Sequence, residues 1–103
     1  MLMKSNVMLA PIHPGEILRE EFLKPMGLSA GHVAKAVNVP RTRIERLANE
    51  QVDLTPDTAL RLARYFGTTA DFWMAIQSRY ALESTGDALA NELASIHPLA
   101  AAE

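Results

Sequence analysis

Signals that begin and end α-helices recur along the whole sequence, and they constrain the fold more than any other feature. Ser, Thr or Asp residues stand at helix-capping positions, among them Ser29, Thr55 and Thr69, and prolines stand at first-turn positions, at short intervals. No window alternates apolar and polar residues as a half-buried strand does. The pattern predicts an all-helical chain, with helices over 14–23, 29–37, 40–49, 56–66, 69–82 and 87–96.

The length and composition suit one globular unit. The chain has 103 residues, 49% of them apolar and 21% charged, whereas single domains most often hold roughly 100 to 150 residues. We therefore expect a single-domain bundle of five to six helices after a flexible leader over 1–12. No apolar run approaches the roughly 18 residues of a membrane span, and the absence of cysteine fits a reducing compartment. A cytoplasmic protein without membrane contact is expected.

Charge is distributed unevenly along the chain. The formal net charge is −2, but residues 25–49 carry +3 while residues 71–103 carry −4. The protein as a whole is therefore not the strongly basic body that is typical of many nucleic-acid binders. Any role in binding nucleic acid must come from the basic middle segment.

That basic segment has the layout of a helix-turn-helix. Two short predicted helices, over 29–37 and 40–49, are joined only by Asn38 and Val39, and the small side chain of Ala34 lies where the helices would cross. Asn38 suits the left-handed conformation of a tight turn. Because the second helix of this motif enters the major groove of DNA, residues 40–49 are the predicted recognition helix.

The faces of this helix follow from its period of about 100° per residue. Ile44, Leu47 and Ala48 share the inward direction. The residues that point outward are Thr42, Glu45, Arg46 and Asn49, and those on the two shoulders are Arg41 and Arg43.

Each of these side chains matches a known mode of DNA contact. Arginine binds guanine bidentately and asparagine binds adenine, which fits Arg46 and Asn49; threonine can contact a thymine methyl or a phosphate, and glutamate accepts from the cytosine amine. Arg41 and Arg43 are expected to contact the backbone. Ser29, at the N-terminus of the first helix of the motif, is expected to contact a further phosphate. A solvated helix face is the alternative that charge alone would favour.

Three strings in the sequence resemble a known family. They are HPGEILREEFLKPMGLS at 13–29, VPRTRIERL at 39–47 and TPDTALRLARYFGTTADFWMAIQSRYALE at 55–83. The chain resembles the HigA-type addiction-module antitoxins, also known as virulence-associated protein I, within the XRE or Cro/C1-like helix-turn-helix regulators. The resemblance is specific, because the HPGEIL opening and the DTALRLARYFGT block are not general features of helix-turn-helix proteins.

The resemblance implies a lambda-repressor-like fold and a homodimer that binds double-stranded DNA at the operator of its own operon. It also implies a partner, a HigB/RelE-like mRNA-cleaving toxin that the protein neutralises by binding. The DNA-binding helix of the family matches residues 40–49. We expect a DNA-binding domain over 13–83, and a C-terminal helix and tail over 84–103 that is a candidate for dimerisation or toxin contact, as is the N-terminal leader.

Three positions depart from the family pattern. Ala30 stands where these proteins often carry a glutamine that contacts phosphate, and Asn38 and Glu50 stand where glycine is common. Glu50 adds negative charge near the expected phosphate path and is expected to weaken DNA binding.

Catalytic and metal sites are not expected. His13, His32 and His97 lie far apart with no cysteine to complete a zinc site, and His13 before Pro14 reads as a helix-entry residue. The carboxylates of Glu16, Glu20 and Glu21 belong to an exposed helix face, where Glu20 and Lys24 have a favourable spacing for an ion pair. No glycine-rich phosphate loop or paired nucleophile is present. We predict no enzyme activity, no cofactor and no metal.

The helix over 69–82 is apolar on too many sides for a lone surface helix, which indicates a second partner. The predicted dimer-interface residues are Phe72, Trp73, Ile76 and Tyr80, with Trp73 foremost.

Two other functions remain open at this point. One is a stand-alone repressor without a toxin, which the adjacent gene would distinguish. The other is a protein-binding inhibitor whose helix-turn-helix no longer binds DNA, suggested by Ala30, Glu50 and the acidic total charge.

Overall fold

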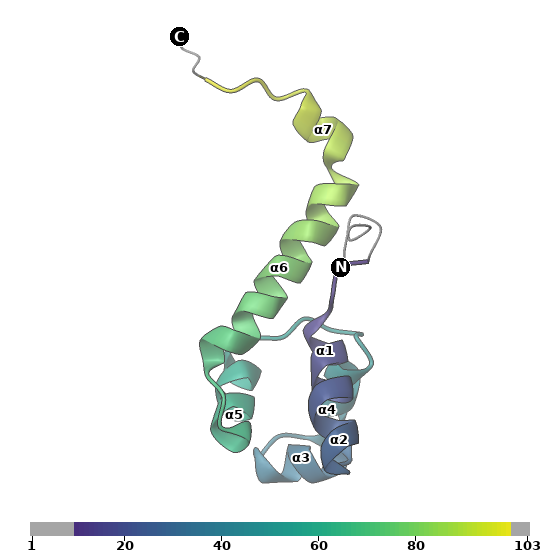
Figure 1. Ribbon diagram of the computed structural model, residues 1–103, viewed down its shortest axis with the longest axis vertical. Helices are drawn as coiled ribbons and strands as arrows, with labels where there is room; N and C mark the ends of the chain where they lie inside the picture. The colour runs from purple at the N-terminus through teal and green to yellow at the C-terminus, as the bar shows by residue number, and fades with distance from the viewer. Residues whose placement is uncertain (1–9, 100–103) are drawn as a thin grey trace.

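The computed structural model describes residues 10–99, and the expected all-helical fold is confirmed for that part of the chain. Figure 1 shows short helices gathered in a lower body and a long helix that rises from it toward the C-terminus. The elements in chain order are α1 (Pro14–Ile17), η2 (Leu18–Leu23), α2 (Lys24–Met26), α3 (Ala30–Ala36), α4 (Arg41–Ala48), α5 (Pro56–Phe66), α6 (Ala70–Ala88) and α7 (Ala90–Ala94).

The first helical segment begins at His13, as expected of a helix-entry residue. His13 Nδ1 accepts a hydrogen bond from the Gly15 N–H at 2.8 Å, so the imidazole caps α1. The ring is buried, and its centroid lies 4.7 Å from that of Tyr80 in an edge-to-face arrangement. Gly15 faces α4 so closely that an added Cβ would overlap the Leu47 carbonyl oxygen. The segment is thus fixed at its start by both α4 and α6.

The same segment continues through Pro25, three residues beyond its expected end at Leu23. A proline within a helix lacks an N–H and crowds the carbonyl four residues earlier. The chain widens into the π-helix η2 just before Pro25, and the Lys24 N–H bonds the Arg19 carbonyl five residues back. Gly27, with φ of 65°, then ends the segment in the left-handed conformation.

Threonine hydroxyls cap the two helices that follow the helix-turn-helix. Thr55 accepts from the Thr58 N–H and Thr69 accepts from the Phe72 N–H, as the sequence predicted for both caps. α6 runs to Ala88 instead of ending at 82, because Gly86 alone costs a helix only about 1 kcal/mol. The expected sixth helix over 87–96 is reduced to α7. The expected division of the chain between 83 and 84 therefore falls inside one continuous helix.

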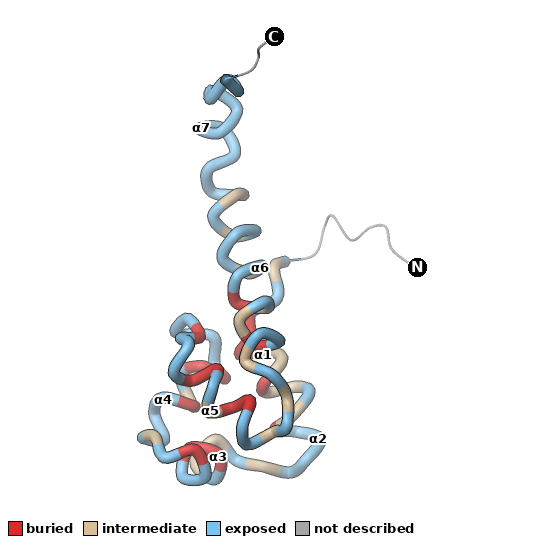
Figure 2. The backbone as a smooth tube through the Cα atoms, turned by 90° about the vertical axis from the view of Figure 1, so that its left-hand side faces the viewer, coloured by how far each residue is buried: buried red, intermediate tan, exposed pale blue. Residues whose placement is uncertain are grey.

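Buried residues are confined to the body; the distal half of α6 is exposed except for the half-buried Ser84 and Gly86, and α7 is exposed (Figure 2). Trp73 is the largest fully buried side chain, with 0% exposure. Its ring lies 5.1 Å from that of Phe22, and its Nε1 donates to Thr68 Oγ1 at 2.8 Å. The prediction that Trp73 contacts a second copy of the chain was wrong, because its side chain is completely buried in the core of this chain.

Among the described residues, no helix has the length and apolar character needed to cross a membrane. Most of the predicted leader over 1–12 lies outside the described residues. The structure describes only its positions 10–12.

Candidate nucleic-acid interface

The predicted helix-turn-helix is present as α3 and α4. Ser29 Oγ caps α3 by accepting from the His32 N–H at 3.0 Å. The connecting turn is closed by a hydrogen bond from the Val39 N–H to the Ala34 carbonyl at 3.0 Å. Asn38 has φ of 63°, which is the left-handed conformation expected for it, and Ala34 is 1% exposed between the two helices.

The faces of α4 follow the period computed from the sequence. Ile44, Leu47 and Ala48 are buried in the core. On the opposite side Thr42, Arg46 and Asn49 are exposed, and Glu45 is half-buried. Thr42 lies in the first turn of α4 and Arg46 in its last turn, whereas Asn49 is the C-cap residue, about 10 Å further along the axis than Thr42 at 1.5 Å per residue. The outward side chains thus lie along the whole length of α4.

The outward residues of α4 differ in their hydrogen-bond partners. Arg41 Nε lies 3.2 Å from Glu45 Oε2, so an ion pair one turn apart occupies part of both side chains. Thr42, Arg46 and Asn49 have no side-chain partner among the described residues.

Arg43 is oriented by α5. Its Nη1 donates to Asp57 Oδ1 at 2.6 Å, and the same oxygen accepts from Arg61 Nε at 2.7 Å. These two guanidinium groups, that of Arg61 first, lower the pKa of Asp57 below its ordinary value. One carboxylate thus holds two cations, one of which belongs to the recognition helix.

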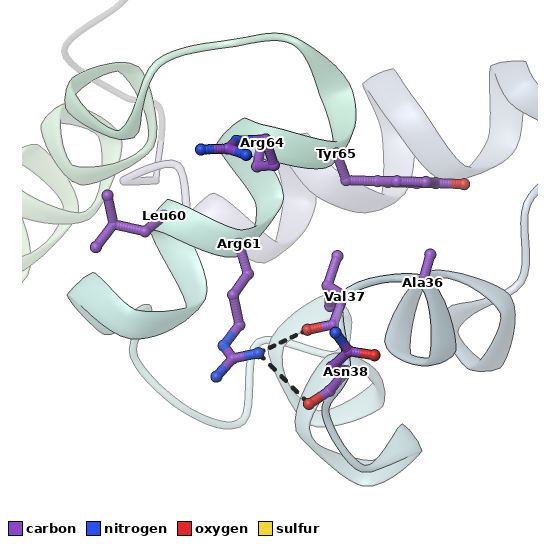
Figure 3. A pocket seen from close by; sticks show the side chains of 7 residues that line it. All are labelled: Ala36, Val37, Asn38, Leu60, Arg61, Arg64 and Tyr65. Atoms are coloured by element: carbon purple, nitrogen blue, oxygen red, sulfur yellow. Dashed lines mark hydrogen bonds between the residues drawn. The ribbon is translucent and has the colours of Figure 1, made fainter.

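Arg61 extends this network to the turn of the motif (Figure 3). Its Nη1 donates to the Val37 carbonyl at 2.7 Å and to the Asn38 carbonyl at 3.4 Å. These carbonyls end α3, where helical partners are lacking. No sequence signal marks Asp57 or Arg61 for this role, because they lie 14 to 24 positions from the groups that they bind.

Arg19 supports the other end of α4. Its Nη1 donates to the Ala48 carbonyl, and its Nη2 lies 3.1 Å from Glu50 Oε2. Glu50 has φ of 62°, the left-handed conformation that glycine adopts more easily. The Glu50 carboxylate is thus paired with a cation of η2, a contact that the sequence did not reveal.

An open groove of about 530 Å³ lies beside this network, between the end of α3 and α5 (Figure 3). It is lined by Ala36, Val37, Asn38, Leu60, Arg61, Arg64 and Tyr65. None of these residues belongs to α4, so the groove is separate from the predicted DNA-reading face.

The remaining predicted dimer residues lie on α6 with differing exposure. Phe72 is 41% exposed, while Ile76 and Tyr80 are half-buried.

Glu20 pairs with Lys24 at 2.9 Å, as their spacing predicted. Within the part of the chain that the structure describes, no group of three or more His, Cys, Asp or Glu side chains is placed to hold a metal ion.

Comparison with known proteins adds to this geometry. Residues 20–73 match the family model described as Helix-turn-helix. The chain is 58% identical to virulence-associated protein I of Dichelobacter nodosus over 72 residues, which are 70% of this chain and 67% of that protein. It is 37% identical to antitoxin HigA-1 of Vibrio cholerae over 89 residues, 86% of this chain and 84% of that one. The chain belongs to the HigA-like helix-turn-helix family.

Solved structures of this family have the same fold. Pseudomonas aeruginosa antitoxin HigA, described with the higBA promoter, superposes with a TM-score of 0.84 at 42% identity, over 86% of this chain and 98% of that one. Antitoxin GraA in complex with its operator superposes with a TM-score of 0.83 at 38% identity, over 88% of this chain and 93% of that one. The family resemblance seen in the sequence is confirmed, and with it the helix-turn-helix fold.

Proposed function

We propose that this protein is a homodimeric antitoxin that represses its own operon and neutralises an mRNA-cleaving toxin by binding it. The outward face of α4, with Thr42 and Arg46 free of intramolecular partners among the described residues, is the observation that carries the DNA-binding part. Relatives described with promoter or operator DNA support it. Because its DNA and an mRNA-cleaving partner share the cytoplasm of a bacterium, that compartment is part of the proposal.

In this proposal α4 enters the major groove and its outward side chains read base edges. Arg46 binds guanine, Thr42 contacts a thymine methyl or a phosphate, and Asn49 binds adenine. Glu45 accepts from cytosine only when its ion pair with Arg41 opens.

Backbone contacts fix the orientation of the motif on the duplex. Arg43 and Arg41 contact phosphates, and Asp57 holds Arg43 in one orientation before DNA arrives. The Ser29 hydroxyl accepts from the backbone and retains its proton for donation to a phosphate.

A second protomer supplies the second recognition helix, since two half-sites about 34 Å apart multiply affinity and specificity. Phe72, Ile76 and Tyr80 are the proposed contacts on α6; the half-buried Ile76 and Tyr80 offer less surface than Phe72. Repression follows from occupancy of an inverted-repeat operator that overlaps the promoter.

The DNA-binding part is tested by gel shifts on the DNA upstream of this gene, over a range of salt concentrations. Arg46→Ala is expected to cost roughly 1 to 3 kcal/mol and to relax preference at one base position in each half-site. Arg79→Ala, which removes the same charge from α6, is the control and should bind like the unaltered protein. An equal loss on every operator variant would contradict base reading by Arg46.

The antitoxin part is tested by co-expression with the product of each adjacent small gene. We expect one product to arrest growth and this chain to relieve the arrest and co-purify with it. If no neighbour is toxic, the protein is a stand-alone repressor, and the DNA-binding part is unaffected.

A further inference from the structure

The C-terminal arm, defined as residues 82–96, extends away from the body. After Gln77 no described residue is buried, and Figure 2 shows a tube that is mostly exposed from the distal half of α6 through α7. The arm nonetheless carries large apolar side chains. Their exposed fractions are 71% for Leu82, 42% for Leu89, 49% for Leu93 and 63% for Ile96.

Three of these side chains, those of Leu82, Leu89 and Leu93, form one stripe along the arm. At about 100° per residue, Leu89 and Leu93 fall within about 20° of the direction of Leu82, whereas Ile96 lies beyond the end of α7. The register continues across the break between α6 and α7, because the Leu89 N–H bonds the Thr85 carbonyl at 2.9 Å and the Leu93 N–H bonds the Leu89 carbonyl at 2.8 Å. The apolar stripe therefore runs from α6 onto α7.

A free helical arm of this kind lacks the interactions that stabilise most helices. Short helices are marginal in water without tertiary packing of an apolar face. Leu82 and its neighbours meet water instead, and a contiguous exposed apolar stripe typically marks an interaction surface. A partner that covers the stripe would supply the missing packing.

The charges on the arm indicate the chemistry of that partner. Residues 80–99 contain three carboxylates, Glu83, Asp87 and Glu92, and no Lys or Arg. On the same helical projection they flank the stripe, with Glu83 and Asp87 on one side and Glu92 on the other. DNA is disfavoured because its phosphates repel the carboxylates. The arm of a second copy of the chain is disfavoured because pairing two arms would bring their carboxylates together. The nearby cation, Arg79, is already paired with Glu83 at 3.3 Å.

We propose that the C-terminal arm docks into an apolar groove with a basic rim on a protein partner. A protein that binds and cleaves mRNA must attract a polyanion and therefore carries a basic surface. This inference rests on the proposed antitoxin function and assigns the toxin-binding surface to the arm. The mode is an amphipathic helix laid in a groove, with the leucines as anchors and the carboxylates at the rim.

The test uses the full-length chain and the purified product of the adjacent toxic gene. One variant, Leu82→Ala with Leu93→Ala, shortens the stripe while keeping good helix formers. Its control, Leu60→Ala with Val52→Ala, truncates exposed apolar side chains of the body. A second variant, Asp87→Lys with Glu92→Lys, reverses the rim charge. Its control, Glu21→Lys with Asp71→Lys, makes the same charge change at exposed positions outside the arm.

Both arm variants are expected to lose at least about tenfold in affinity for the adjacent gene product. They should also fail to relieve growth arrest, while both controls behave like the unaltered chain. DNA binding by gel shift and dimer mass by light scattering should be unchanged in the arm variants.

Two results would overturn the inference while leaving the antitoxin function in place. One is unchanged affinity in both arm variants. The other is a shift from dimer to monomer, which would assign the arm to a second copy of the chain. Failure of the unaltered protein itself to bind any neighbour would instead overturn the antitoxin function, so the two failures are distinguishable.

Discussion

The helix-turn-helix body, residues 13–77, and the C-terminal arm, residues 82–96, are built from similar local sequence and end in opposite environments. Both contain helices with apolar side chains at helical spacing. In the body these side chains meet across elements: the ring centroids of Phe22 and Phe66 lie 4.7 Å apart, and Trp73 is covered completely. In the arm, Leu82 and Leu93 are largely exposed among the described residues. An amphipathic pattern therefore predicts that a face will be covered, but it does not specify by which molecule.

Truncating the largest buried side chain of the body and the most exposed leucine of the arm should distinguish the two regions most clearly. Trp73→Ala is expected to destabilise the protein by about 3 to 5 kcal/mol, because it leaves a cavity in a packed core. Leu82→Ala should change stability by less than about 0.5 kcal/mol. Urea unfolding at one fixed protein concentration measures both. If Trp73→Ala prevents folding, Trp73→Phe should give an intermediate loss, and equal losses for Trp73 and Leu82 variants would contradict the comparison.

Replacing one glycine of each region by alanine should change stability in opposite directions. Gly15→Ala places a Cβ against the Leu47 carbonyl, where backbone must move, and is expected to cost about 1 to 3 kcal/mol. Gly86→Ala, in α6 with nothing near the added Cβ, should stabilise the protein by about 0.4 to 1 kcal/mol. Thermal melts of the two variants test this. Loss of stability in both would mean that the distal half of α6 is packed in solution.

Gln77 is the last buried residue before the arm, so substitutions on either side of this boundary should differ in their effect on stability. Its Oε1 accepts from the Leu54 N–H at 2.7 Å in the interior. Gln77→Ala leaves this donor without a partner and is expected to cost about 1 to 3 kcal/mol. Ser78→Ala, one residue later and exposed, should have almost no effect. Hydrogen exchange at the Leu54 amide should rise in the first variant and not in the second.

The smallest expected effect concerns pH. The lowered pKa of Asp57 means that its ion pairs stabilise the folded state above the unfolded value of about 3.8, and that this contribution is lost as pH falls through the still lower folded value. Asp57→Asn should therefore flatten the stability profile below about pH 4. In α6, Glu83→Gln removes a pair that joins α6 only to itself, and should leave that profile unaltered.

The sequence anticipated features that depend on neighbouring residues. The caps at Ser29, Thr55 and Thr69, the left-handed turn at Asn38 and the inward face of α4 were all predicted correctly, because each is fixed within one or two helical turns. The end of the first segment was placed too early, because the π-helix that accommodates Pro25 has no simple sequence signal. α6 was also predicted too short, because Gly86 suggests a helix break but costs the helix only about 1 kcal/mol.

Contacts between distant segments could not be anticipated in the same way. The Arg61 contact with the Val37 carbonyl and the Arg19 contact with Glu50 join residues 24 and 31 positions apart. A single sequence shows only that such charged residues exist, not which of many partners they meet. Trp73 illustrates the same difficulty, because an aromatic residue on a helix suits a core and an interface equally well.

By itself, the sequence determined the all-helical class, the position of the helix-turn-helix and the family, since periodicity, capping and specific motifs are local properties. Only the tertiary structure decided that Trp73 belongs to the core, that Asp57 orients Arg43, and that the apolar side chains of the C-terminal arm stay exposed among the described residues. The reason is physical. Burial and ion pairing depend on which surfaces pack together in three dimensions, and the apolar pattern of one helix is compatible with several packing partners.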